Sequence, residues 1–111
     1  MSDAPVEAFE PPYYSVVFTT VRTQDQSGYR DTNARMEELV KDIPGYLGMD
    51  HAQNPGGLGI TVAYFSDAEA LTQWRTNAEH QAAQRRGRAE WYDSYTIHIA
   101  KVERSHTFKR A

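Results

Sequence analysis

The sequence predicts an α+β fold of the ferredoxin-like type, a βαββαβ sandwich in which the helices cover one face of an antiparallel sheet. Three observations lead to this prediction. Four runs are rich in aromatic and β-branched residues, two segments carry apolar residues at helical spacing, and their order is strand, helix, strand, strand, helix, strand. With 111 residues, the chain is long enough to form one domain around one core.

The first strand and the first helix are predicted within residues 13–43. Residues 13–21, YYSVVFTTV, have apolar side chains at both alternating positions, which is typical of a strand covered on both faces. After a polar turn at residues 23–28, apolar residues recur at helical spacing until Pro44-Gly45 ends the run. These apolar residues are Tyr29, Met36, Leu39, Val40 and Ile43. The segment is therefore predicted to be an amphipathic helix.

The second and third strands are predicted to form a hairpin. Residues 46–53 and 58–65 are short extended runs, and Asn54-Pro-Gly-Gly57 between them is a turn-forming cluster. A last strand is predicted at residues 92–102, YDSYTIHIAKV, followed by a polar tail.

The second helix is predicted to break in the middle. Ser66-Asp-Ala-Glu69 has the pattern of a capping box, and Thr76-Asn-Ala-Glu79 repeats it ten residues later. We therefore expect the chain to stop and restart rather than run as one helix to Arg88. On an unbroken helix Trp74 and His80 would point about 120° apart, whereas a kink near Thr76 can turn both toward one cavity.

The chain is predicted to consist of an N-terminal arm, residues 1–12, and a single domain, residues 13–111. The arm contains Pro5, Pro11 and Pro12 among acidic residues, which favours an extended conformation. Strands one, three and four are apolar at both alternating positions, so the sheet face without helices also needs a cover. A second copy of the chain is the simplest cover, and we expect a homodimer with its sheets face to face.

Composition excludes several classes of protein. The formal net charge of −3 and pI near 5.7 lack the basic excess of nucleic-acid-binding proteins. The RNA-binding modules with this strand order carry aromatic residues on their third strand, and GLGITVA at residues 57–63 has none. No apolar run has the length of a membrane span and no signal pattern opens the chain, so we predict a soluble, cytoplasmic protein. The absence of cysteine and of short paired histidine spacing predicts no metal site.

In the order PGYLGMD, GITVAYFSDAEALTQW, EHQAAQRRGRAEWY and HIAKVER, the sequence resembles the antibiotic biosynthesis monooxygenase family of dimeric α+β barrels. The resemblance covers nearly all of residues 13–108. It implies the ferredoxin-like fold, the dimeric α/β barrel and a small-molecule site. Because such folds host enzymes, binders and proteins of other roles, it implies an activity less directly.

Two branches of this family can be compared with the chain position by position. In the haem-degrading branch, a Trp on the second helix is followed ten residues later by a His that ligates iron, and an Asn lies on the first strand. Trp74 matches, but Gln84 stands at the His position and residues 13–22 contain no Asn. In the branch that oxidises aromatic phenols without a cofactor, an Asn precedes the Trp by four residues and a Tyr follows it by six. Those positions are Ala70 and His80 here.

The resemblance therefore implies a cofactor-independent monooxygenase acting on an electron-rich aromatic or phenolic molecule. His80 would be the base that removes a substrate proton, and Trp74 would form the pocket wall and offer its indole N–H. Further candidate substrate-binding residues are Tyr64, Tyr92, Tyr95, His51 and His98. Two alternatives stay open: a non-catalytic dimer that binds a small hydrophobic molecule, and a haem-binding or haem-degrading member of the family. Ordinary core packing also accounts for Trp74, since its spacing from Leu71 and Ala78 is that of one helix face.

Overall fold

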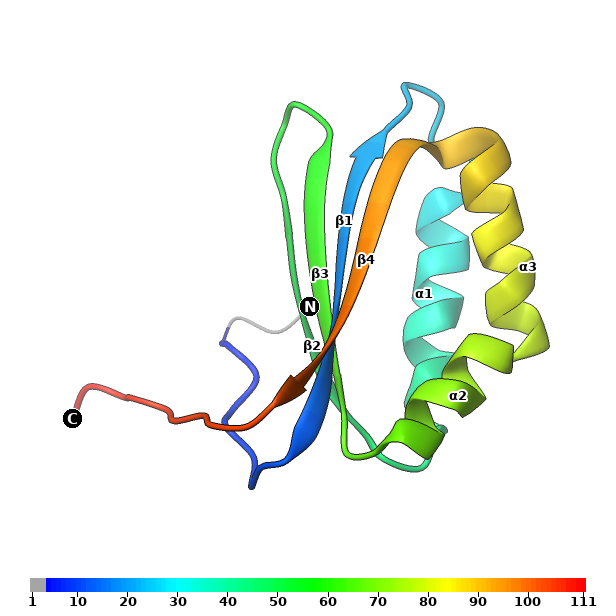
Figure 1. Cartoon of the computed structure of the whole chain (residues 1–111). Coiled ribbons are helices and arrows are strands. Elements are labelled where there is room, and N and C mark those ends of the chain that lie inside the picture. The colour runs from blue at the N-terminus through cyan, green and yellow to red at the C-terminus, as the bar shows by residue number, and fades with distance from the viewer. Residues whose placement is uncertain (1–3) are drawn as a thin grey trace.

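The computed structural model describes residues 4–111, and it confirms the predicted α+β fold. Its elements are β1 Tyr13–Arg22, α1 Tyr29–Val40, β2 Tyr46–Gln53, β3 Leu58–Phe65, α2 Ala68–Thr76, α3 Ala78–Arg86, a π-helical turn Gly87–Trp91, and β4 Tyr92–Val102. All neighbouring strands are antiparallel, in the order β2-β3-β1-β4. The helices form a second layer on one face of this sheet (Figure 1).

Strand register decides which side chains face the helices. Phe18 of β1 lies opposite Thr61 of β3 and Ile97 of β4, and these three residues line the space beneath the helices. The next residue along β1, Val17, pairs with Val62 and His98, whose side chains therefore lie on the opposite, helix-free face.

The buried core lies between the sheet and the helices. Val40 of α1, Phe65 of β3 and Ala70 of α2 are almost completely buried and contact one another in one cluster. Trp74 is half-buried against this cluster. The core therefore holds α2, and with it Trp74, near the end of the sheet where β3 finishes (Figure 1).

The predicted break in the second helix is confirmed. Asn77 lies between α2 and α3 with an extended backbone, φ −62° and ψ 126°, and its side chain accepts a hydrogen bond from the His80 N–H at 3.0 Å. Asp67 caps α2 in the same way, through the Ala70 N–H at 2.8 Å. The predicted caps, Ser66 and Thr76, were thus each wrong by one residue.

Local hydrogen bonds explain the two corrected caps. Ser66 donates its backbone N–H to the Gly45 carbonyl at 2.7 Å, which ties it to the turn before β2 rather than to the helix. Thr76 is still helical, and its hydroxyl donates to the Thr72 carbonyl at 2.7 Å. Asp67 and Asn77, which do cap the two helices, both have the extended backbone that suits this position.

Residues 4–12 lie on the helix-free face of the sheet. Residues 1–3 of the predicted arm are outside the described part of the chain, and residues 4–12 contain no helix or strand. Val6 donates its N–H to the Asp50 carboxylate at 2.9 Å and packs its methyl groups against Gly48 on β2. Phe9 meets Tyr13 edge to face, with ring centroids 5.8 Å apart. These contacts cover one end of that face and leave the other end uncovered.

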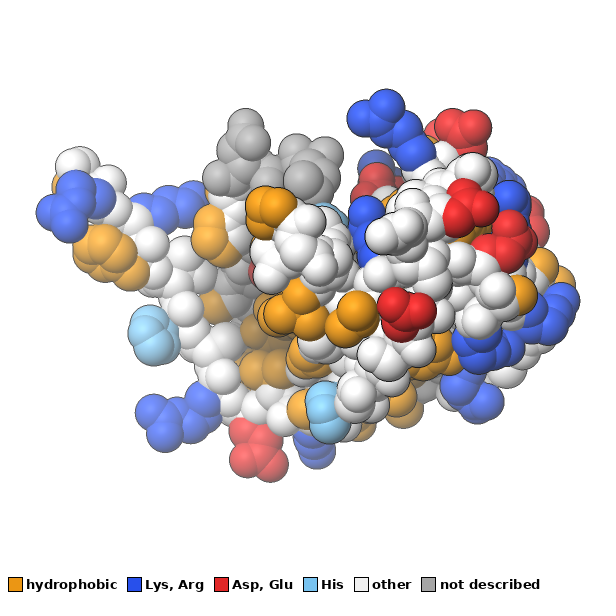
Figure 2. All heavy atoms as spheres, turned by 90° about the horizontal axis from the view of Figure 1, so that it is seen from above, with side chains coloured by type: hydrophobic (Ala, Val, Ile, Leu, Met, Phe, Trp, Pro, Cys, Tyr) orange, Lys and Arg blue, Asp and Glu red, His pale blue; other side chains and the backbone are white. Residues whose placement is uncertain are grey.

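Charged side chains are unevenly distributed over the surface (Figure 2). Seen from above, Asp and Glu side chains are most numerous over the helical layer, whereas a group of hydrophobic side chains is visible toward the sheet, where Lys and Arg side chains also project (Figure 2). Within residues 4–111, no helix is both long and apolar enough to span a membrane.

Candidate functional site

A cavity of about 190 Å³ lies between the sheet and the helices α1 and α3. Its aromatic walls are Phe18, Tyr29, Phe65, Trp74, Trp91, Tyr92 and Tyr95. Its polar lining residues are Thr32, Asn33, Glu37, His51, Thr61, His80 and Gln84. Ile97 of the edge strand also lines the cavity but keeps 41% of its surface exposed, so the cavity is open to solvent beside β4.

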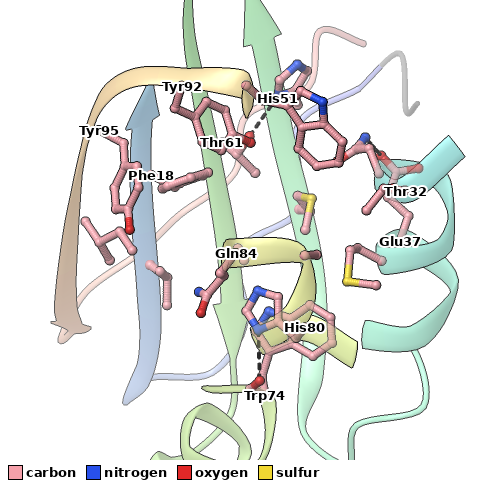
Figure 3. Close-up of a pocket in the computed structure, with 18 of the residues that line it drawn as sticks. Phe18, Thr32, Glu37, His51, Thr61, Trp74, His80, Gln84, Tyr92 and Tyr95 are labelled. Atoms are coloured by element: carbon pink, nitrogen blue, oxygen red, sulfur yellow. Dashed lines mark hydrogen bonds between the residues drawn. The ribbon is translucent and has the colours of Figure 1, made fainter. Parts of the chain in front are cut away.

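The helix break brings Trp74 and His80 into direct contact. Their rings stack with centroids 3.8 Å apart and planes inclined by 14°. The imidazole Nδ1 lies 2.9 Å from the Trp74 carbonyl oxygen, which also accepts a hydrogen bond from the Asn77 N–H at 3.3 Å at the end of α2 (Figure 3). Since a carbonyl oxygen only accepts, Nδ1 carries the hydrogen, and Nε2 of the neutral ring keeps its lone pair.

His80 is held in its neutral form. Burial lowers the pKa of His80 below its usual 6.5, because the cationic ring would lose solvation. The hydrogen bond to the Trp74 carbonyl acts in the opposite direction and raises the pKa, but it is the smaller effect. At neutral pH the ring is therefore an uncharged proton acceptor.

A second imidazole lies toward the other end of the cavity (Figure 3). His51 on β2 has its Nδ1 2.7 Å from the Thr61 hydroxyl on β3. Burial lowers the pKa of His51, the charge of Arg22 lowers it further, and the carboxylate of Glu37 opposes both. His51 is therefore also neutral at pH 7, and its tautomer is free to change because a hydroxyl both donates and accepts.

Aromatic rings enclose the space between the two imidazoles. Phe18 packs edge to face with Tyr92 and Tyr95, at centroid distances of 5.6 and 5.2 Å. Burial raises the pKa of Tyr92 well above its usual value, so its phenol stays protonated and serves as a donor, not as a base. The Tyr95 hydroxyl accepts a hydrogen bond from Arg88 at 3.3 Å.

The structure brings together five of the seven residues singled out in the sequence. These are His51, Trp74, His80, Tyr92 and Tyr95. Tyr64 and His98 do not line the cavity. They pair with Ser15 and Val17, on the sheet face away from the helices. Tyr64 instead packs against Tyr13, with ring centroids 6.0 Å apart.

Sequence reasoning missed Gln84 as a site residue. It appeared only as a mismatch to the haem-ligating His, yet its side chain lines the cavity. A usable signal was present, because Gln84 follows His80 by four residues and residues at that spacing share one face of a helix. Glu37 and Thr61 carried no comparable signal in the sequence. They line the cavity only because α1 and β3 lie next to β2 in space.

The site does not fit a haem group. A cavity of roughly 150 Å³ holds one benzene molecule, and the cavity here measures about 190 Å³, whereas a haem has four pyrrole rings. Gln84 at the position of the family's iron ligand offers only a neutral amide. Among residues 4–111, no three His, Asp or Glu side chains converge in a way that could hold a metal ion.

Comparison with known proteins agrees with this fold. Residues 12–86 match the family described as antibiotic biosynthesis monooxygenase. The uncharacterized protein YqjZ of Bacillus subtilis (strain 168) is 44% identical over 100 residues, which covers 90% of this chain and 88% of YqjZ.

Two solved structures resemble the chain in fold at low sequence identity. A mutant of SnoaB, described as a cofactor-independent oxygenase from Streptomyces nogalater, has a TM-score of 0.72 at 10% identity, covering 84% of this chain and 95% of that one. Rv0793 from Mycobacterium tuberculosis has a TM-score of 0.74 at 12% identity, covering 86% and 99%. The sequence match and the shared fold together show that this chain belongs to the antibiotic biosynthesis monooxygenase family.

Proposed function

We propose that the protein is a cofactor-independent monooxygenase of an electron-rich aromatic or phenolic small molecule. One observation carries the proposal: a neutral imidazole, His80, presents a free Nε2 beside an indole N–H in an aromatic cavity. SnoaB, which shares the fold, is described as a cofactor-independent oxygenase. That description supports the reaction class and leaves the substrate to be found.

The proposed chemistry requires little more than proton transfer. His80 Nε2 removes the phenolic proton, and the resulting anion is electron-rich enough to reduce dioxygen. One oxygen atom then bonds to a ring carbon that loses its hydrogen, and the other oxygen leaves as water, so that a phenol and O₂ yield a quinone and H₂O. All the electrons come from the substrate. Trp74 Nε1, which bonds to no residue within 4–111, is free to donate to an oxygen that gains negative charge.

Oxygen consumption tests the proposal directly. We expect the protein to take up oxygen with 1-naphthol, at a rate above that without protein, in the presence of a metal chelator and without added flavin. His80→Ala should lower kcat by about 10²–10⁴-fold, the range of a general base, and Trp74→Phe should lower it less. His106→Ala, an exposed imidazole in the C-terminal tail, is the matched control. Full turnover by His80→Ala refutes the site, and tight binding without oxygen uptake identifies a non-catalytic binder.

The pH profile provides an independent test of the base. Because burial lowers the pKa of His80, its neutral form predominates above pH 6.5. We expect kcat/KM to rise with pH through one ionisation below 6.5 and to be level at higher pH. A rate that falls over this range would remove His80 from the role.

We also propose that the protein is a homodimer formed through the helix-free sheet face. That face carries Leu58 and Ile60, each 42% exposed, next to Val21 at 37%. Exposed apolar residues on adjacent strands are a common sign of an interface, and a second copy presents the same flat surface. Ile60→Lys should convert the dimer to a monomer in sedimentation analysis, whereas Lys101→Ala should not. A wild-type protein that sediments as a monomer at micromolar concentration would overturn this proposal.

A further inference from the structure

Gln84 lies on the same face of α3 as His80, one helical turn further along. Residues at this spacing have side chains roughly 5–6 Å apart, and both line the cavity. The amide of Gln84 is directed into the space between α3 and the sheet (Figure 3). It makes no hydrogen bond to any residue within 4–111, so its donors and its acceptor are available to a ligand.

The hydrogen-bonding groups at this end of the cavity are complementary to two oxygen atoms. His80 Nε2 accepts a hydrogen, and the Gln84 amide and the Trp74 indole each donate one. A single hydroxyl that donates to Nε2 has two lone pairs left, for which the indole and the amide both compete. Because His80 and Gln84 are one helical turn apart, a second oxygen beside the first gives the amide its own acceptor without drawing the hydroxyl away from Nε2.

The cavity also limits the size of the ligand. Its volume of about 190 Å³ is moderately larger than the roughly 150 Å³ cavity that holds benzene. One or two fused rings fit this space, and the opening beside Ile97 leaves room for a substituent that reaches solvent.

We propose that Gln84 is a specificity-determining residue that selects aromatic substrates of one or two rings bearing two neighbouring oxygen atoms, one held by His80 and the other by the Gln84 amide. The inference rests on the proposed function for its use of His80 as the base. It assigns a separate role to Gln84, which is to bind the second oxygen and fix which ring carbon is exposed to dioxygen.

Two isomeric probes test this role without turnover. In 1,8-dihydroxynaphthalene the hydroxyls are adjacent across the ring junction, and in 1,5-dihydroxynaphthalene they are on opposite sides of the molecule. Their size and composition are identical. Calorimetric titration under anaerobic conditions gives Kd for each, and the quantity of interest is the ratio of the two values.

We expect the wild type to prefer the 1,8 isomer by about three- to tenfold, the value of one hydrogen bond. Gln84→Leu keeps the side-chain volume but removes the amide, and it should bring the ratio close to one. Gln81→Leu on the outer side of α3 is the matched control and should keep the preference, because Gln81 does not line the cavity.

Equal affinities in the wild type, an unchanged ratio in Gln84→Leu, or failure of both probes to bind would overturn the inference. None of these results depends on catalysis. Oxygen uptake and its loss in His80→Ala test the monooxygenase proposal separately, so either proposal can fail without the other.

Discussion

Removing the side-chain cap at the helix break should measurably destabilise the protein. Asn77 accepts a hydrogen bond from the His80 N–H at 3.0 Å and turns the chain between α2 and α3. Asn77→Ala deletes that acceptor and leaves a helix-end N–H without a protein partner. Such substitutions cost about 1 kcal/mol, and for a chain of 111 residues this corresponds to a fall in Tm of about 4 °C.

Urea unfolding followed by far-UV circular dichroism measures the change in the free energy of unfolding. Asn77→Asp keeps an acceptor oxygen and should stay within about 0.5 kcal/mol of the wild type. Thr76→Ala is the decisive comparison, because the sequence pattern makes Thr76 the cap. In the structure its hydroxyl bonds back to the Thr72 carbonyl instead. Since alanine favours a helix more than threonine does, Thr76→Ala should be neutral or slightly stabilising.

The reasoning fails if Thr76→Ala costs as much as Asn77→Ala, or if Asn77→Ala is neutral. Either result would mean that the cap is not where the structure places it. It would also weaken the site, because the same bend sets the Trp74 and His80 rings 3.8 Å apart.

Three further predictions concern stability. Arg35→Ala removes a bidentate ion pair with Glu79 that joins α1 to α3 at 2.9 Å. Because both side chains are about half exposed, urea unfolding should show only a small loss of stability, and a smaller one in 1 M NaCl; a large loss would contradict their exposure. Folding lowers the pKa of His80 and His51, so the unfolded chain binds more protons than the folded chain near pH 6. The Tm measured by calorimetry should therefore fall as the pH is lowered from 7.5 to 5.5. A rise in Tm would contradict the burial of the two rings. Trp91→Phe removes a buried indole whose N–H donates to the Ser27 carbonyl at 2.9 Å. Urea unfolding should show that the free energy of unfolding falls by about 1–3 kcal/mol. An unchanged free energy of unfolding would mean that this contact is absent in solution.

Local patterns were sufficient to predict the strands. The hairpin was predicted at residues 46–53 and 58–65, and β2 and β3 have these bounds. The last strand was predicted at residues 92–102, which is the range of β4. Each prediction depended on β-branched or aromatic residues followed by turn-forming ones, and both are properties of neighbouring residues in the chain.

Assigning residues to the site was less complete. His51 and His98 lie on different strands, and alternation within a strand shows which residues share a face but not which face carries the helices. Register settles the question, because His51 pairs with Thr61 under the helices and His98 pairs with Val17 on the other side. The proton on His80 Nδ1 likewise follows from a backbone carbonyl that only the bend of the chain brings within reach.

The sequence by itself determined the order of the elements, the place where the second helix breaks, and the expectation that the break can turn Trp74 and His80 toward one cavity, because each depends on patterns among neighbouring residues in the chain. The stacking of the two rings came from the structure. The tertiary structure alone decided which residues share the cavity, how large it is, and that Gln84 belongs to it. These properties depend on how β2, β3, α1 and α3 pack, and packing is set by the sum of many distant contacts rather than by any local pattern.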